Sequence, residues 1–163
     1  MSLNKLILIT ILFSVNSFAE VIRFDVISLE SPAFEGRVFG DVGQYQKITA
    51  KVTIAVDPKH GLNQDIVDID IAPLNDNGLV EAVADLVIIR PLDLTKGNER
   101  IYYEVLNRGD KISLIMMNDA EWKGYYKDLD PGNGHLMKEG YSIVWSGWQG
   151  DMPSGDNLSL IHI

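Results

Sequence analysis

The sequence predicts an α/β fold in which a β-rich amino-terminal region precedes a partly parallel sheet. Residues 21–29 and 47–56 alternate apolar with polar side chains, which is the period-2 pattern of strands buried on one face. Further along, a helix-like segment lies between two strand-like segments, residues 101–106 and 141–145. This order is typical of a βαβ unit, whose crossover is right-handed.

Between these two parts, the sequence predicts two more strands and a turn. Residues 66–72 (IVDIDIA) again alternate apolar with polar side chains, and residues 79–90 form a long apolar segment. The Asn-Gly pair within residues 75–78 favours a hairpin turn between them, because such turns need positive φ. Pro91 ends the last strand, since it cannot donate to a ladder.

The carboxyl-terminal half contains short helices. Residues 107–109 (NRG) predict a tight break after the strand at 101–106, and residues 111–120 predict a short helix. Asn133 can cap a second short helix through residues 135–137, which Gly140 ends in a left-handed conformation. The continuous apolar strand at 141–145 suits a sheet that is covered on both faces.

The composition fits one soluble globular domain. The 163 residues are 46% hydrophobic and 23% charged, with a net charge of −9 and no cysteine. A disulfide scaffold and a cysteine-ligated metal site are therefore excluded, and so is a broadly basic nucleic-acid binder. No internal repeat or linker indicates a second domain.

The amino terminus has the three-part form of a secretory signal peptide. Residues 1–5 carry one positive charge, residues 6–15 are apolar apart from Thr10 and Ser14, and Ser17-Phe18-Ala19 supplies small residues at −3 and −1. The apolar run is too short for a membrane-spanning helix, which needs ~20 residues. We expect residues 1–19 to be removed and the protein to be exported, to the periplasm or the medium, without a stable membrane span.

Four segments resemble the start of the bacterial α/β-hydrolase-domain proteins. They are VIRFDVISLESPAFEGRVFGDVGQYQKI, IVDIDIAPLNDNGLVEAVADLVIIRP, YYEVLNRGDK and GNGHLMKEGYSIVWSGWQGD. The pieces VLNRG and GYSIVWSGWQGD match in spacing as well as in residue type. The resemblance implies that residues 20–157 are the amino-terminal part of an α/β-hydrolase domain, with a partial α/β-hydrolase-like sheet. It also implies a cofactor-free serine hydrolase that cleaves small-molecule esters or other acyl compounds.

The same resemblance assigns part of an oxyanion hole to the loop after the strand at 101–106. The candidates are Asn107, Arg108, Gly109 and Asp110, whose amides would stabilise the charge of a tetrahedral intermediate. From spacing alone, Asn107 and Gly109 also fit a simple exit turn.

The SGWQGD segment follows the strand at 141–145, near the end where ligands of α/β sheets bind. Ser146 is not predicted to be a nucleophile, because SGWQG lacks the GxSxG pattern. By resemblance this segment is a loop after a strand, and Trp148 and Gln149 are candidate pocket-wall residues.

No catalytic triad can be assembled from these 163 residues. GxSxG is absent, and the histidines are His60, His135 and His162, in a loop, on a short helix and near the end. We therefore expect the nucleophile, acid and histidine to lie downstream, and the chain alone to be inactive. The alternative is a non-enzymatic periplasmic β-rich module that binds a ligand through aromatic residues: Tyr125, Tyr126, Trp145 and Trp148.

Two loops carry enough oxygen ligands to suggest calcium. One contains Asp128, Asp130 and Asn133, and the other contains Asp68, Asp70, Asn75 and Asp76. The first loop places Pro131 where an EF-hand has a free residue and lacks the closing glutamate. Asp68 and Asp70 are explained by the solvent face of a strand, so no metal site is predicted.

The last six residues, 158–163 (LSLIHI), form an apolar tail outside the resemblance. They are also the translation of a transposon end used in preparing sequencing libraries. We therefore interpret them as a non-native tail and exclude them from the fold prediction.

Overall fold

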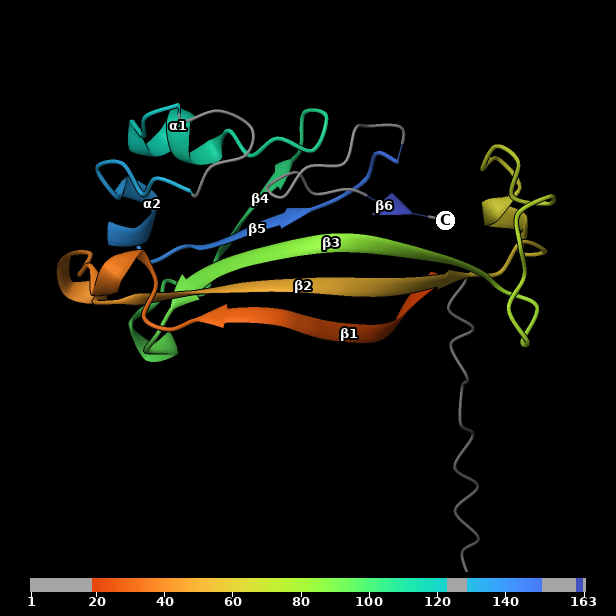
Figure 1. The fold of residues 1–163 in the computed structure, drawn as a ribbon, viewed down its shortest axis with the longest axis horizontal. Coiled ribbons are helices and arrows are strands. Elements are labelled where there is room, and N and C mark those ends of the chain that lie inside the picture. The colour runs from red at the N-terminus through yellow and green to blue at the C-terminus, as the bar shows by residue number, and fades with distance from the viewer. Residues whose placement is uncertain (1–18, 123–128, 151–160, 163) are drawn as a thin grey trace, which may run out of the picture.

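The computed structural model describes residues 19–122, 129–150 and 161–162, which form a mixed β-sheet (Figure 1). The strand order is β1-β2-β3-β5-β4, and β6 lies beside β3. The strands are β1 (Ala19–Glu30), β2 (Tyr45–Val56), β3 (Val80–Pro91), β4 (Ile101–Val105), β5 (Ser142–Ser146) and β6 (Ile161–His162). No helix in this part of the chain is long and apolar enough to cross a membrane.

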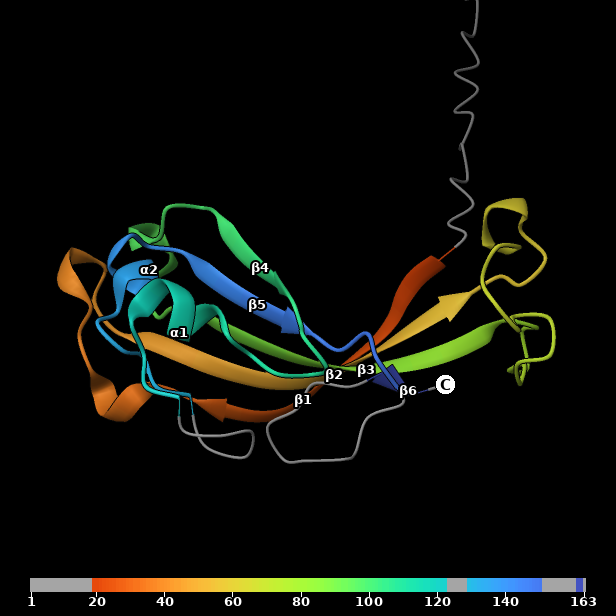
Figure 2. The ribbon, with the colours of Figure 1, turned by 90° about the horizontal axis from the view of Figure 1, so that it is seen from above.

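Three long antiparallel strands form most of the sheet. β1 pairs with β2, and β2 pairs with β3 without a break from Tyr45 opposite Pro91 to Val56 opposite Val80. Figure 2 shows β2 and β3 curving together along the molecule. The strands predicted at 21–29, 47–56 and 79–90 are confirmed, and Pro91 is the last residue of β3. Alternation located them correctly because each has a long neighbour to pair with.

The predicted α/β class is wrong, because the fold is β-rich. β4 and β5 are parallel, as the βαβ pattern predicts. Their connection, however, contains only α1 (Ser113–Asn118) and α2 (His135–Lys138) among the described residues. These helices of six and four residues are too short to cover the whole sheet, and both lie at one end of the molecule (Figure 1). The expected partial α/β-hydrolase-like sheet is therefore replaced by a mixed sheet dominated by its antiparallel strands.

The strand predicted at 66–72 is also wrong. This segment consists of turns, in which the Ile69 amide donates to the Ile66 carbonyl and the Ile71 amide donates to the Asp68 carbonyl. Ile69 is buried but Val67 and Ile71 are exposed, and no strand in the described part of the chain pairs with the segment. Alternation alone is not sufficient when a pairing partner is missing.

The core lies between one face of the sheet and the two helices. Ile143 and Trp145 on β5, Ile89 on β3 and Tyr45 on β2 pack there with Leu136 of α2. Along β5, buried residues alternate with half-buried ones, so the predicted cover on both faces is wrong. Gly140 ends α2 with a φ of 80°, as predicted. The N-cap of α2, however, is Gly134, and the Asn133 side chain accepts the His135 amide from one residue before the cap.

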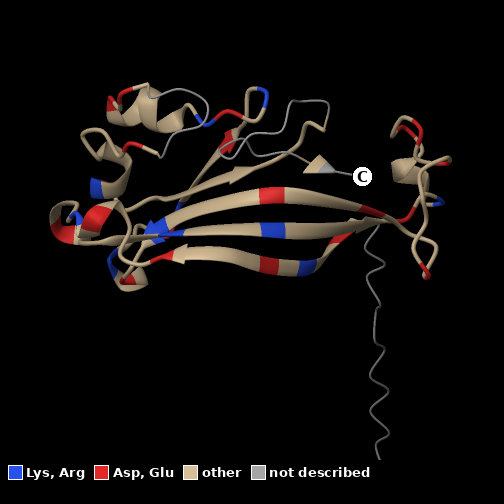
Figure 3. Ribbon diagram, viewed as in Figure 1, with Lys and Arg blue, Asp and Glu red and all other residues tan. Residues whose placement is uncertain are grey.

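The two faces of the sheet differ in charge. On the helix side, the register places Asp25, Lys51 and Asp85 in one row, which Figure 3 shows as a charged band across β1, β2 and β3. The opposite face presents an uncharged row across five strands. Its members are Leu29, Ile48, Ile88, Val144 and Tyr103. Leu29 and Tyr103 are more than half exposed, so apolar surface reaches both outer strands of the main sheet.

Candidate functional site

The candidate site lies where the parallel strands β4 and β5 end. Val105 pairs with Ser146 at these carboxyl ends, and the loops that follow stay in contact. The Trp148 indole Nε1 donates a 2.7 Å hydrogen bond to the Leu106 carbonyl. The structure therefore brings the predicted oxyanion loop and the predicted pocket-wall segment to the same edge of the sheet.

Residues 107–110 form a tight turn. The Asp110 amide donates to the Asn107 carbonyl at 3.0 Å, and Arg108 and Gly109 have φ values of 54° and 81°. Positive φ at both central positions is the signature of a type I′ turn. The local conformation is thus the exit turn that spacing alone suggests. Among the described residues, the amides of Arg108 and Gly109 reach no hydrogen-bond acceptor.

Glu104, which was not predicted as a site residue, holds the segment that follows the turn at residues 107–110. Its buried carboxylate accepts the amides of Ile112 and Ser113 at 2.8 and 2.9 Å, and it also accepts the Trp145 indole Nε1. The same indole lies 3.1 Å from the Ser113 hydroxyl. A glutamate on the covered face of a largely apolar strand was the only sequence signal for this network. The network fixes residues 112–113, just beyond the turn.

Burial changes the electrostatics of the same loop. It lowers the pKa of Lys111 to about 8, although the carboxylates of Asp110, Asp85 and Glu104 act in the opposite direction. Burial also raises the pKa of Asp110, and the Lys111 amide and charge offset this effect in part. The loop therefore holds a cation that can lose its proton at mildly alkaline pH.

The two pocket-wall candidates differ in exposure. Trp148 is about half exposed, with 53% of its surface accessible, while Gln149 is half-buried. The Gln149 side-chain oxygen is buried and has no hydrogen-bond partner within the described part of the chain. Ser146 is the last residue of β5 and is half-buried. Of these three residues, only Trp148 presents a large surface to solvent.

The histidines do not complete this edge. The His60 ring accepts the Leu62 amide in the loop between β2 and β3, and His135 is exposed on α2. His162 lies on β6, where its backbone pairs with Val83. The two histidines with described side chains therefore belong to other elements than β4, β5 and their loops.

Two of the calcium candidates, Asn75 and Asp130, accept hydrogen bonds within turns. The Asn75 Oδ1 accepts the amides of Asn77 and Leu79, and the Asp130 Oδ1 accepts the Gly132 amide. Asp128 lies outside the described residues. In the described ranges, no three His, Asp or Glu side chains gather closely enough to hold a metal ion.

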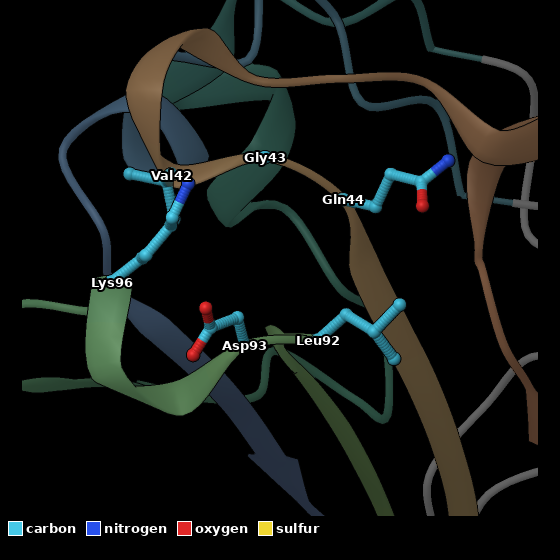
Figure 4. Close-up of a pocket in the computed structure, with 6 residues that line it drawn as sticks. All are labelled: Val42, Gly43, Gln44, Leu92, Asp93 and Lys96. Atoms are coloured by element: carbon cyan, nitrogen blue, oxygen red, sulfur yellow. The ribbon is translucent and has the colours of Figure 1, made fainter.

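A shallow hollow of about 280 Å³ lies elsewhere on the surface (Figure 4). It is lined by Val42, Gly43, Gln44, Leu92, Asp93 and Lys96. The Asp93 carboxylate accepts both the amide and the hydroxyl of Thr95, which lowers its pKa. The Asp93 carboxylate is the one acidic group that lines the hollow, and it is used by the local turn. The hollow is therefore not a candidate site.

Comparison with known proteins identifies no relative: no family model, no curated protein and no solved structure matches this chain.

Proposed function

We propose that this chain supplies the oxyanion-binding turn of an exported serine hydrolase, an esterase-like enzyme that transfers acyl groups to water. One observation carries the proposal. The successive amides of Arg108 and Gly109 have no acceptor among the described residues, and they sit in a tight turn at the carboxyl end of a parallel strand pair.

Amides of this kind suit the chemistry of ester cleavage. When a serine attacks an acyl carbon, the carbonyl oxygen becomes negatively charged, and fixed N–H donors stabilise that charge. Gly109 has no side chain to hinder the approach of this oxygen, and its φ of 81° suits glycine. The Glu104 network holds the loop rigid without occupying the turn amides.

The proposal places the nucleophile, the acid and the histidine in polypeptide that follows these residues. The sequence contains no GxSxG motif. β4 is the last strand in the sheet order, and Ile101, Tyr103 and Val105 are exposed on it. Such an apolar outer strand supports the addition of further structure, because exposed edges of this kind are normally covered.

The experiment is to recover the continuing reading frame and to express the extended protein. We expect GxSxG, then an acidic residue and a histidine, together with hydrolysis of p-nitrophenyl butyrate. In that protein, Gly109→Ala should lower kcat at least ~10-fold with little change in KM, because an oxyanion contact forms mainly in the transition state. Gly61→Ala is the control, since a Cβ at Gly61 meets no atom within 4 Å. A frame without these residues, or unchanged kcat in Gly109→Ala, contradicts the proposal.

The β-rich sheet favours a second candidate, a non-enzymatic binding or structural module. The aromatic ligand surface suggested for it is reduced, because Trp145 is fully buried in the core. Tyr125 and Tyr126 lie outside the described residues, which leaves Trp148 as the exposed aromatic candidate. Cooperative unfolding of residues 20–157 expressed alone would favour this module, whereas aggregation favours the hydrolase part.

A further inference from the structure

β3 has one edge that is only partly covered by the main sheet. On one side it pairs with β2 over its full length. On the other side β5 pairs with residues 86–89, and the Gly147 amide donates to the Asp85 carbonyl at 2.8 Å. Beyond Gly147 the chain leaves β3, and β6 takes its place opposite Val83 and Ala84. The short strand β6 thus continues the sheet where β5 ends.

β6 also has a backbone neighbour on its far side. The Ile161 amide donates to the Gln149 carbonyl at 3.2 Å. A Cβ atom built on Gly150 would lie 2.8 Å from the Ile161 carbonyl oxygen, which is too close for any side chain. β6 therefore lies in a slot between β3 and residues 149–150, and the width of that slot depends on glycine at position 150.

We propose that this slot is a binding site for an extended apolar peptide strand, and that β6 is its occupant within this chain. Its contacts are those of strand addition, in which main-chain pairing supplies affinity and alternate side chains supply specificity. Ile161 lies opposite Ala84, whose small, fully buried side chain leaves room for a large apolar partner. Because these contacts are mainly to backbone, the slot can accept a segment that is foreign to the protein.

The register indicates how a better occupant would be built. Glu81 and Ala82 have no partner on this side of β3 among the described residues, whereas Val80 forms a bridge there with Leu74. An occupant that runs antiparallel to β3, as β6 does, reaches these residues after the position of His162. A peptide that extends past this position by one or two residues should therefore bind more tightly, because it adds ladder hydrogen bonds.

The test uses the full chain with Ile161→Pro, which removes the amide that donates to Gln149. The probe is a fluorescein-labelled peptide with the sequence of residues 157–163 (NLSLIHI). By fluorescence anisotropy, the peptide should bind Ile161→Pro at least ~10-fold more tightly than the unchanged chain, whose slot is already filled. A peptide with proline at the position of Ile161 should bind neither protein.

Gly150 supplies the matched control. In the Ile161→Pro chain, Gly150→Val should abolish peptide binding, while Gly61→Val should retain it. Amide hydrogen exchange over residues 80–85 gives a second measurement: exchange should rise in Ile161→Pro and fall again when the peptide is added. The proposal is wrong if Gly150→Val leaves binding unchanged, or if a folded Ile161→Pro chain neither binds the peptide nor regains protection.

Discussion

The Glu104 carboxylate accepts a hydrogen bond from the indole Nε1 of Trp145, which lies 41 positions later in the chain. This bond joins β4 to β5 inside the core, because both side chains are buried. The same carboxylate accepts the amides of Ile112 and Ser113 at the start of α1. One buried acidic group therefore ties together the two parallel strands and the loop between them.

Glu104→Ala should lower the free energy of unfolding by about 3 kcal/mol, because three buried donors lose their acceptor. Urea unfolding followed by tryptophan fluorescence measures the loss. Glu104→Gln keeps one acceptor oxygen and should lose about half as much. Glu121→Ala is the control, since Glu121 is exposed and only its backbone amide makes a described bond. A Glu104→Ala protein as stable as this control would show that the network contributes little.

Lys111 should make stability depend on alkaline pH. Burial lowers its pKa from 10.5 to about 8, so the unfolded chain binds more protons than the folded chain between these values. Stability should therefore rise as the pH increases from about 8 toward 10. Lys111→Met should remove this rise and increase the free energy of unfolding at pH 7 by about 1 kcal/mol. Urea midpoints at several pH values test both statements, and an unchanged rise in Lys111→Met would contradict them.

Tyr45 should act in the opposite direction above pH 10. Its buried hydroxyl lies 2.9 Å from the Met137 carbonyl and 3.1 Å from the Tyr141 carbonyl, and burial raises the pKa of Tyr45 from its usual value near 10. The stability that it contributes is complete below pH 10 and is lost as the pH rises, because the unfolded chain ionises first. Tyr45→Phe should cost about 1 kcal/mol at pH 7 and flatten the decline above pH 10. Tyr102→Phe, on a half-buried tyrosine, is the comparison.

The long strands could be predicted from sequence, because alternation reports a real burial pattern where neighbouring strands exist. Residues 66–72 carry the same alternation without a described strand as neighbour, and there the chain forms turns in place of a strand. The predicted α/β class failed because of a tertiary contact. A Cβ on Gly132 would lie 2.2 Å from the carbonyl oxygen of Asn118, so the loop before α2 packs directly on the end of α1. Periodicity carries no information about this contact.

The candidate site likewise has some features that could be predicted from the sequence and others that could not. The turn at Arg108 and Gly109 follows from local residue preferences, and its place at the strand ends follows from the order of elements. The role of Glu104 and the lowered pKa of Lys111 depend on Trp145 and Asp85, which belong to other strands. Sequence spacing identified the backbone of the site, whereas the environment of its charged groups required the assembled sheet.

The turn itself can be tested by stability. Gly109→Ala places a Cβ at a φ of 81° and should lower the free energy of unfolding by about 1 kcal/mol. Arg108→Asn should be neutral or slightly stabilising, since asparagine tolerates left-handed φ better than arginine does. Both are compared by urea unfolding with Gly61→Ala, where φ is not positive. A loss in Arg108→Asn as large as that in Gly109→Ala would contradict a type I′ turn.

The exposed edge strand should control solubility. Phe24 and Val26 on β1 are about half exposed, with 48% and 58% of their surface accessible, and they lie on the uncharged face of the sheet. Long apolar edge strands promote pairing between chains, and lysine on such a strand opposes it. Phe24→Lys with Val26→Lys should therefore reduce aggregation on heating, measured by light scattering, while the urea midpoint changes little. As a control, lysine at Ser28, on the opposite face of β1, should have a smaller effect, because that face already carries the charged row. Protection by Ser28→Lys equal to that of Phe24→Lys alone would mean that net charge, rather than this face, governs association.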